Sequence, residues 1–145
     1  MTTFPLEAVM DVVALIARIV FTAIFVGAGI GHLTATEAMA GYAAAKKLPM
    51  AKLAVQVSGV YILVASALLI LGIWPDLAAI ALVPFLLITA FVFHDFWTQE
   101  SPEMRQQEQI QFNKDIALAG GALALFVLYA SDGHPGLTLV GPLFT

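Results

Sequence analysis

The stretch that decides the fold is "LAAIALVPFLLITAFVFHDFW", residues 77–97. From Leu77 to Phe93 it carries no charged side chain, and it then ends in His94 and Asp95 between aromatic residues. A helix needs about 20 mostly apolar residues to cross about 30 Å of hydrocarbon. The stretch therefore predicts a membrane-spanning helix whose polar end lies at the membrane surface.

The whole chain has the same character. Of its 145 residues, 61% are hydrophobic and 11% are charged, whereas a soluble domain carries about 25% charged residues. The charges are clustered and leave four long apolar runs, at about 11–33, 51–73, 77–97 and 112–130. We therefore predict an all-α integral membrane four-helix bundle that forms a single domain over residues 1–145, with the lipid bilayer as its surroundings.

The segments between these spans differ in polarity. Residues 34–50 are alanine-rich but hold Glu37, Lys46 and Lys47, so we expect a short interfacial helix between spans one and two. Residues 98–111 are the one strongly polar loop. Within it, Ser101 followed by Pro102 resembles an N-cap with proline at the first helical position, so a helix can begin there and run into span four.

Two features inside the spans bear on packing. Pro84 cannot donate a hydrogen bond to the carbonyl of Ile80, so span three should bend and leave an acceptor free. Ala23, Gly27 and Gly31 form a stripe of small residues in span one. Such a stripe allows close helix approach. It fits packing within the chain better than a homo-oligomer, which remains the alternative.

Charge and cysteine content exclude several functional classes. The net charge is −4 and no basic stripe is present, so nucleic acid is not an expected partner. The chain has no cysteine, which excludes disulfides, thiol catalysis and thiolate metal sites. The loops opposite the termini, together with the span ends that adjoin them, hold five basic residues: Lys46, Lys47, Lys52, Arg105 and Lys114. The positive-inside rule therefore predicts both termini outside.

Alternating helix directions bring several polar residues to the cytoplasmic edge of the bundle. The candidates are His32, Gln56, His94, Asp95, Lys114 and Asp115, with Trp97 beside them in an aromatic belt. These can be ordinary interface residues solvated by water and headgroups. Alternatively, His94 lines a headgroup pocket together with His32 and one of Asp95 or Asp115. His94 and Asp95 point about 100° apart on a helix, so both cannot face the same neighbour.

A histidine changes its protonation near neutral pH, so such a pocket suits a quinone, whose reduction takes up protons. A b-type haem between His32 and His94 is a weaker alternative, because axial histidines are the usual requirement but two histidines near the end of a bundle are weak evidence for haem. A metal held by His94, Asp95 and His32 has similarly little support. The sequence assigns no metal site and no catalytic residue.

Arg18 is the one charge placed well inside a span, about 9 Å deep at 1.5 Å per residue. It can serve as a structural anchor, either by reaching outward to Asp11 on the same helical face or by bonding the acceptor freed by Pro84. It can instead act as a functional intramembrane counter-charge. Since about 21 Å of helix separates Arg18 from His32, the two cannot share a small ligand.

Three motifs resemble the DoxX family of small four-helix membrane proteins: "LIARIVFTAIFVGAGIGHL" (15–33), "HDFW" (94–97) and "FNKDIALAGGALAL" (112–125). The resemblance implies a bundle in the bacterial plasma (inner) membrane. It also implies a link to redox chemistry, because the family takes its name from a subunit of a thiosulfate:quinone oxidoreductase. The positions of this chain that match family motifs are Arg18, His94, Trp97, Lys114 and Asp115.

This chain departs from the family pattern at two places. His32 stands where the family usually has a lysine. Tyr61 and Ile62 stand where many members have a glutamate, and this difference puts a proton-coupled mechanism in doubt.

The function these features favour is a quinone- or lipid-binding membrane subunit of an oxidoreductase system. The chain holds no complete catalytic apparatus, so a soluble or membrane partner, docked on 98–111, would hold the electron-donor site. A non-catalytic membrane anchor is the alternative, and a small-solute transporter is a weaker one.

Overall fold

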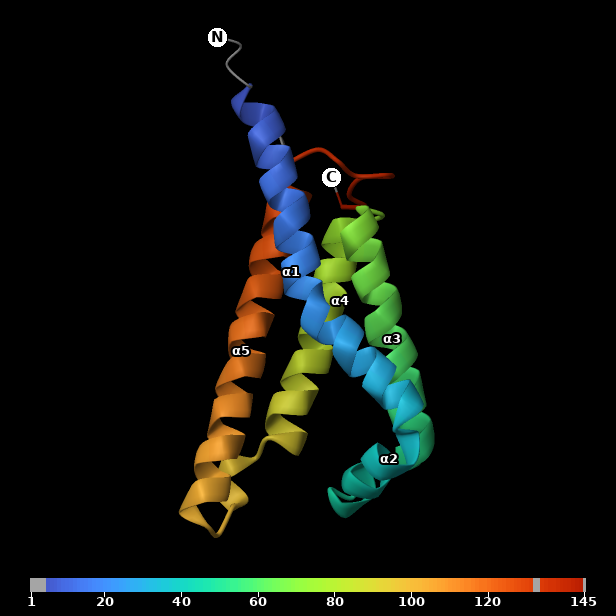
Figure 1. Ribbon diagram of the computed structural model, residues 1–145, viewed down its shortest axis with the longest axis vertical. Helices are drawn as coiled ribbons and strands as arrows, with labels where there is room; N and C mark the ends of the chain where they lie inside the picture. Colours follow the sequence, from blue (N-terminus) through green and yellow to red (C-terminus); the bar gives the residue numbers. More distant parts are fainter. Residues whose placement is uncertain (1–4, 132–133, 145) are drawn as a thin grey trace.

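The computed structural model describes residues 5–131 and 134–144, and this part of the chain is helical almost throughout (Figure 1). In chain order the elements are α1 (Leu6–Thr34), α2 (Thr36–Ala45), α3 (Ala51–Leu71), α4 (Pro75–Ile88), the π-helix η1 (Thr89–Phe93), the 3-10 helix η2 (Phe96–Thr98) and α5 (Pro102–Ala130). The predicted all-α fold, with a short helix between the first two spans, is confirmed.

Four stretches of the described chain are long and apolar enough to cross a membrane: Leu6–Thr34, Ala51–Leu71, Pro75–Thr98 and Pro102–Ala130. Large apolar side chains such as Val20, Val57 and Val127 are exposed on their outer faces. In lipid these surfaces need no further cover, because the surrounding acyl chains are equally apolar.

The interior joins two helix pairs. α1 packs on α3 and α4 packs on α5, while α3 also contacts α4 and α2. The core side chains that link the pairs include Phe25, Ile62, Leu82, Leu86 and Ala122. Towards the end of the bundle that holds α2, the two pairs diverge (Figure 1), and α2 bridges them through its contacts with the end of span three, such as the hydrogen bond from Tyr42 to the Phe93 carbonyl.

Glycine sets the distance between α1 and α3. A Cβ at Gly59 would lie 2.8 Å from Cβ of His32, and one at Gly29 would lie 3.1 Å from the Gly59 carbonyl oxygen. The close contact therefore runs through Gly29 and not through the predicted stripe, since a Cβ at Gly27 would meet nothing within 4 Å. The expectation that the stripe packs within the chain was wrong for Gly27.

The polar segment 98–111 was expected to be a loop in which a helix can begin, and it is helical from Pro102 onward. The reason is the local cap, because the Ser101 hydroxyl accepts a hydrogen bond of 3.1 Å from the Met104 amide. The predicted N-cap is confirmed, and the cap lets α5 continue without interruption into the fourth span.

The C-terminal segment runs back across the end of the bundle where α3 meets α4. Asp76 accepts hydrogen bonds from the amides of Leu143 and Phe144, and Asp11 accepts one of 2.7 Å from the Gly136 amide. The start of α1, the turn between α3 and α4, and this segment therefore share one end of the molecule (Figure 1).

Candidate functional site

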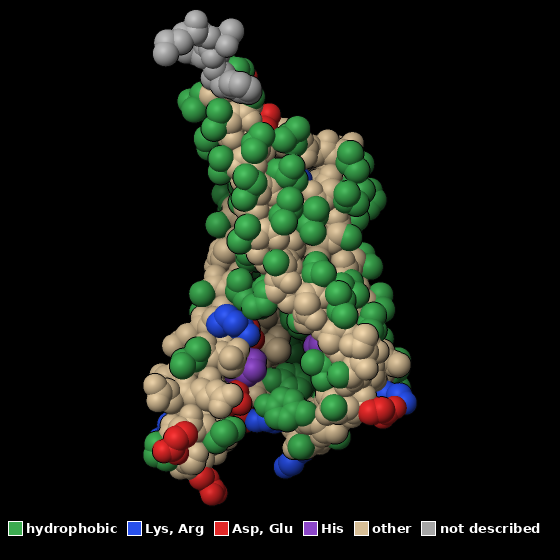
Figure 2. Space-filling model, viewed as in Figure 1, with side chains coloured by type: hydrophobic (Ala, Val, Ile, Leu, Met, Phe, Trp, Pro, Cys, Tyr) green, Lys and Arg blue, Asp and Glu red, His purple; other side chains and the backbone are tan. Residues whose placement is uncertain are grey.

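A cavity of about 440 Å³ lies where the two helix pairs diverge. One wall comes from α1, α2 and α3, and the other comes from α4 and η1, with the side chain of His94. In Figure 2 the hollow is seen in the lower half of the molecule, with histidine surfaces at its rim. Its polar lining residues are His32, Tyr42, Ser58, Thr89 and His94.

The chain geometry around His94 follows from a change in helix type. α4 ends at Ile88 and continues as the π-helix Thr89–Phe93, after which the His94 amide still donates to the Thr89 carbonyl over 3.2 Å. A single π-helical turn widens the helix and is frequent at functional sites. The turn places His94 at the end of the apolar run, beside both the cavity and α5.

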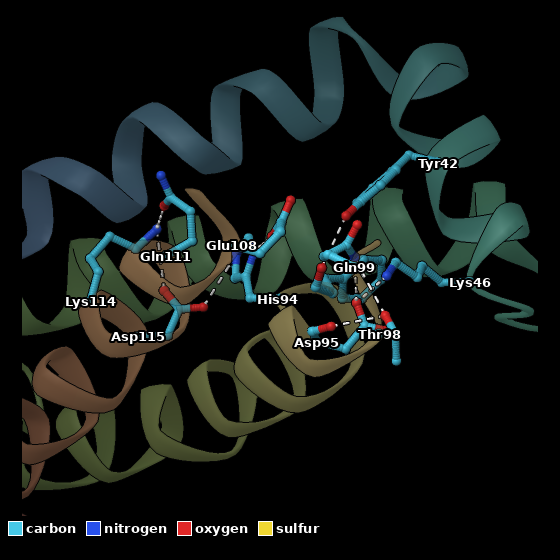
Figure 3. Close-up of polar contacts among 11 residues, drawn as sticks. Tyr42, Lys46, His94, Asp95, Thr98, Gln99, Glu108, Gln111, Lys114 and Asp115 are labelled. Atoms are coloured by element: carbon cyan, nitrogen blue, oxygen red, sulfur yellow. Dashed lines mark hydrogen bonds and ion pairs between the residues drawn. The ribbon is translucent and has the colours of Figure 1, made fainter. Parts of the chain in front are cut away.

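Both ring nitrogens of His94 face carboxylates of α5 (Figure 3). Nδ1 lies 2.8 Å from Oε2 of Glu108, and Nε2 lies 3.7 Å from Oδ2 of Asp115. Lys114 completes the cluster, with its Nζ 3.3 Å from Oδ1 of Asp115 and 2.7 Å from Oε1 of Gln111. Of the two acids considered for His94, the structure brings Asp115 to it and not Asp95.

Glu108 was missed because it lay in the segment expected to be a loop. A signal was available in the spacing, since Glu108 precedes Asp115 by two helical turns and both then lie on one face. The continuous α5 puts the two acids one above the other against His94.

Asp95 takes part in a separate contact, between α2 and the end of span three. It forms an ion pair with Lys46, and the Tyr42 hydroxyl donates a hydrogen bond of 2.9 Å to the Phe93 carbonyl (Figure 3). Burial, together with the charges of Glu108 and Asp95, raises the pKa of Tyr42 above its usual value, although Lys46 opposes this. The hydroxyl therefore keeps its proton at neutral pH and remains a donor.

His32 lies on the opposite wall and is held by α3. Its Nδ1 is 2.8 Å from Oγ of Ser58 and 3.3 Å from the carbonyl oxygen of Val55. His32 and His94 therefore line one cavity, as the headgroup-pocket hypothesis requires.

Two further candidates lie outside the cavity. Gln56 borders an open apolar groove between α3 and α4, of about 640 Å³, on the outer surface. Trp97 is half exposed and packs edge-on against Phe96 and Phe112. An aromatic cluster at this depth suits the membrane interface. Neither side chain lines the cavity.

Arg18 is fully buried at the other end of the bundle. Its guanidinium donates to the carbonyls of Leu69 and Leu137, over 3.3 and 2.8 Å, and its Cζ lies 5.7 Å from the Tyr129 ring centroid. Neither acceptor expected from the sequence is used. Asp11 instead bonds the Gly136 amide, and the carbonyls of the C-terminal segment and α3 take the place of the one freed by Pro84.

The arrangement does not favour haem or metal. Both His94 nitrogens are directed at carboxylates, so ligation of iron would break these contacts. Asp95 is paired with Lys46. Across residues 5–131 and 134–144, no group of three or more His, Cys, Asp or Glu side chains is placed to hold a metal ion.

Comparison with known proteins agrees with this fold. The chain is 28% identical over 136 residues to the inner membrane protein YphA of Escherichia coli, and the match covers 94% of each chain. No solved structure matches the chain. The DoxX family pattern matches residues 13–95, which is more than half of the chain and includes every residue that lines the cavity. The chain therefore belongs to the DoxX family.

Proposed function

We propose that this DoxX protein binds a quinone-type headgroup in the cavity of His32 and His94 and serves as the membrane subunit of a redox system. The observation that carries the proposal is that two histidines, from span one and from the end of span three, line one cavity of about 440 Å³. Ligand sites typically measure about 300–1,000 Å³ and combine apolar walls with a few polar groups.

The lining favours a neutral ring over a phospholipid headgroup. Phe85, Phe93 and the Tyr42 ring supply flat apolar surface, which suits an aromatic ligand. The described lining residues include no lysine or arginine, so a phosphate group would lack the cationic partner that normally binds it.

The cellular setting follows by analogy with the relative. Because that protein is an inner membrane protein, we place this chain in the inner membrane as a multi-pass protein. The lysine-bearing end, with α2 and the start of α5, faces the cytoplasm under the positive-inside rule. Both termini then lie outside.

An electron donor has to come from a second protein. The sequence contains no cysteine and no dinucleotide-binding fingerprint. The first turns of α5 offer a docking surface, because Glu103, Arg105 and Gln107 are exposed. The same surface supports the second candidate function, a non-catalytic anchor that recruits a partner without quinone. A transporter has less support, because Ile62, Leu82 and Leu86 fill the centre of the bundle.

Quinone extraction from purified protein tests the proposal. Protein purified in mild detergent should carry the ligand, measured as quinone plus quinol by solvent extraction and chromatography, and His32→Phe and His94→Ala should each lose most of this total. Gln56→Ala is the matched control, since Gln56 lies outside the cavity, and should keep the wild-type content. Wild-type protein without quinone or quinol, or both cavity variants with an unchanged total, contradicts the proposal.

Docking is tested separately. Replacing Glu103, Arg105 and Gln107 together with alanine should abolish partner pull-down and leave the quinone content unchanged. If this variant loses the partner and the wild-type protein contains no quinone, the anchor function is favoured.

A further inference from the structure

The polar side chains of the cavity wall offer a ligand hydrogen-bond acceptors but few donors. Five polar side chains line the cavity: His32, Tyr42, Ser58, Thr89 and His94. Their polar hydrogens are directed at acceptors within the protein, whereas several of their lone pairs are not used. Which kind of ligand the cavity accepts depends on this difference.

Each of the three hydroxyl groups donates its single hydrogen to a backbone carbonyl. Ser58 donates to the Val55 carbonyl over 2.9 Å, and Tyr42 donates to the Phe93 carbonyl over 2.9 Å. Thr89 donates to the carbonyl of Phe85. A hydroxyl has one hydrogen and two lone pairs, and a carbonyl oxygen can only accept. Towards a ligand these hydroxyls therefore act as acceptors.

The contacts of His32 decide its tautomer. Nδ1 of His32 lies 2.8 Å from Oγ of Ser58, which accepts its hydrogen when the Ser58 hydroxyl donates to Val55. The Val55 carbonyl, 3.3 Å from the same nitrogen, is also an acceptor. Nδ1 therefore carries the hydrogen, and Nε2 of the neutral ring presents a lone pair. No hydrogen bond to Nε2 is formed within residues 5–131 and 134–144.

His94 supplies no free donor either. Nδ1 is 2.8 Å from the Glu108 carboxylate, which accepts its hydrogen, and Nε2 faces Asp115 at 3.7 Å. Both nitrogens are thus turned to the carboxylates of α5.

We propose that the cavity selects a headgroup that donates hydrogen bonds, and that it therefore binds the reduced quinol in preference to the quinone. This inference rests on the proposed function, namely that a quinone-type ligand occupies this cavity. A quinol hydroxyl can donate to Nε2 of His32. A quinone carbonyl has only lone pairs, so it would face another acceptor and leave both groups without a partner. Sites built around one hydrogen-bonding partner reject analogues that lack it for this reason.

Three compounds separate donor recognition from ring recognition: a short-tailed benzoquinol, the matching benzoquinone, and the di-O-methyl ether of the quinol. Binding is measured by anaerobic titration calorimetry on the full chain in phosphatidylcholine nanodiscs, because the choline headgroup has no hydrogen-bond donor and cannot compete. We expect the quinol to bind at least about tenfold more tightly than the quinone or the ether, which corresponds to one lost hydrogen bond.

Two substitutions at His32 extend the test. His32→Phe keeps a ring but removes the acceptor, so the preference for the quinol should disappear while the apolar contribution to binding remains. His32→Lys replaces the acceptor with a donor, so the preference should reverse towards the quinone. Gln56→Ala should retain the wild-type preference. Size-exclusion profiles confirm that each variant is folded, and the wild-type ratio of affinities stands even if a variant is not.

The outcomes distinguish this inference from the proposed function. Equal affinity of wild-type protein for all three compounds, or tighter binding of the quinone, overturns the selectivity and leaves the cavity as a quinone site. If none of the three compounds binds, both the proposed function and the selectivity fail.

Discussion

At the scale of single residues, Gly72 lies where the end of α3 contacts the C-terminal segment. It adopts a φ of +65°, and a Cβ there would lie 2.6 Å from Nη1 of Arg18 and 2.6 Å from Cα of Thr138. A residue other than glycine in this conformation costs about 1–3 kcal/mol, and the overlap with backbone adds to that cost. Gly72 therefore allows Arg18 and the C-terminal segment to meet at this end of the bundle.

Gly72→Ala should accordingly lower the stability of the protein by at least about 1–3 kcal/mol. The measurement is the amount of folded protein that remains in detergent after heating, followed by size-exclusion chromatography. Gly120→Ala is the matched control, because a Cβ at Gly120 meets nothing within 4 Å and alanine is the better helix former. A Gly72→Ala protein as stable as the Gly120→Ala protein would show that the junction does not hold the segment.

The sequence alone predicted the level along the bundle at which the candidate residues lie, but not which of their side chains face the cavity. The ends of the apolar runs correctly put His32, His94 and Asp115 at one depth, because depth follows from counting residues along a helix. Which way each side chain points depends on helix rotation, and these spans are apolar on nearly every face, so the sequence holds little rotational signal. For this reason Gln56 and Trp97 were included although they face outward.

At the scale of elements, α2 closes one side of the cavity and is tied to the end of span three. The ties are the ion pair of Lys46 with Asp95 and the hydrogen bond from Tyr42 to the Phe93 carbonyl. The sequence predicted an interfacial helix at this place, but not its partner. The partner could not be predicted because the two residues of the ion pair are 49 positions apart in the sequence, and nothing local specifies their contact.

The interaction energy between Lys46 and Asp95 should be measurable, because each side chain is only 18% exposed. In a double-mutant cycle of Lys46→Met and Asp95→Asn, we expect a coupling of about 1 kcal/mol in the opening free energy of the α2 amides. Hydrogen–deuterium exchange over Thr36–Ala45 reports this quantity.

The Lys52–Glu37 pair is the internal control on the same side of the molecule. Its side chains are 59% and 79% exposed, so its coupling should be below about 0.5 kcal/mol. Equal coupling in the two cycles would mean that the Lys46–Asp95 contact does not fasten α2 to span three.

At the scale of the whole molecule, one end of the bundle is closed and the other is open. One end is closed by the C-terminal segment, which is held by Arg18, Asp11 and Asp76. The other end opens where the helix pairs diverge, and the cavity and most of the charged side chains lie there (Figures 1 and 2). The number and order of the spans were predictable from apolar run lengths, whereas the divergence was not, because it depends on how whole helices pack.

The orientation of these two ends can be measured directly, because the chain contains no cysteine and single cysteines can be introduced without a background. Gln107 is exposed on α5 at the cavity end, and Leu139 is 71% exposed in the C-terminal segment. If lysine-rich loops face the cytoplasm, a membrane-impermeant maleimide should label Leu139→Cys in intact spheroplasts and label Gln107→Cys only after the membrane is permeabilised. A permeant maleimide serves as the control for reactivity and should label both. The opposite labelling pattern would place the cavity end and its acidic cluster outside the cell, where a cytoplasmic electron donor could not dock on α5.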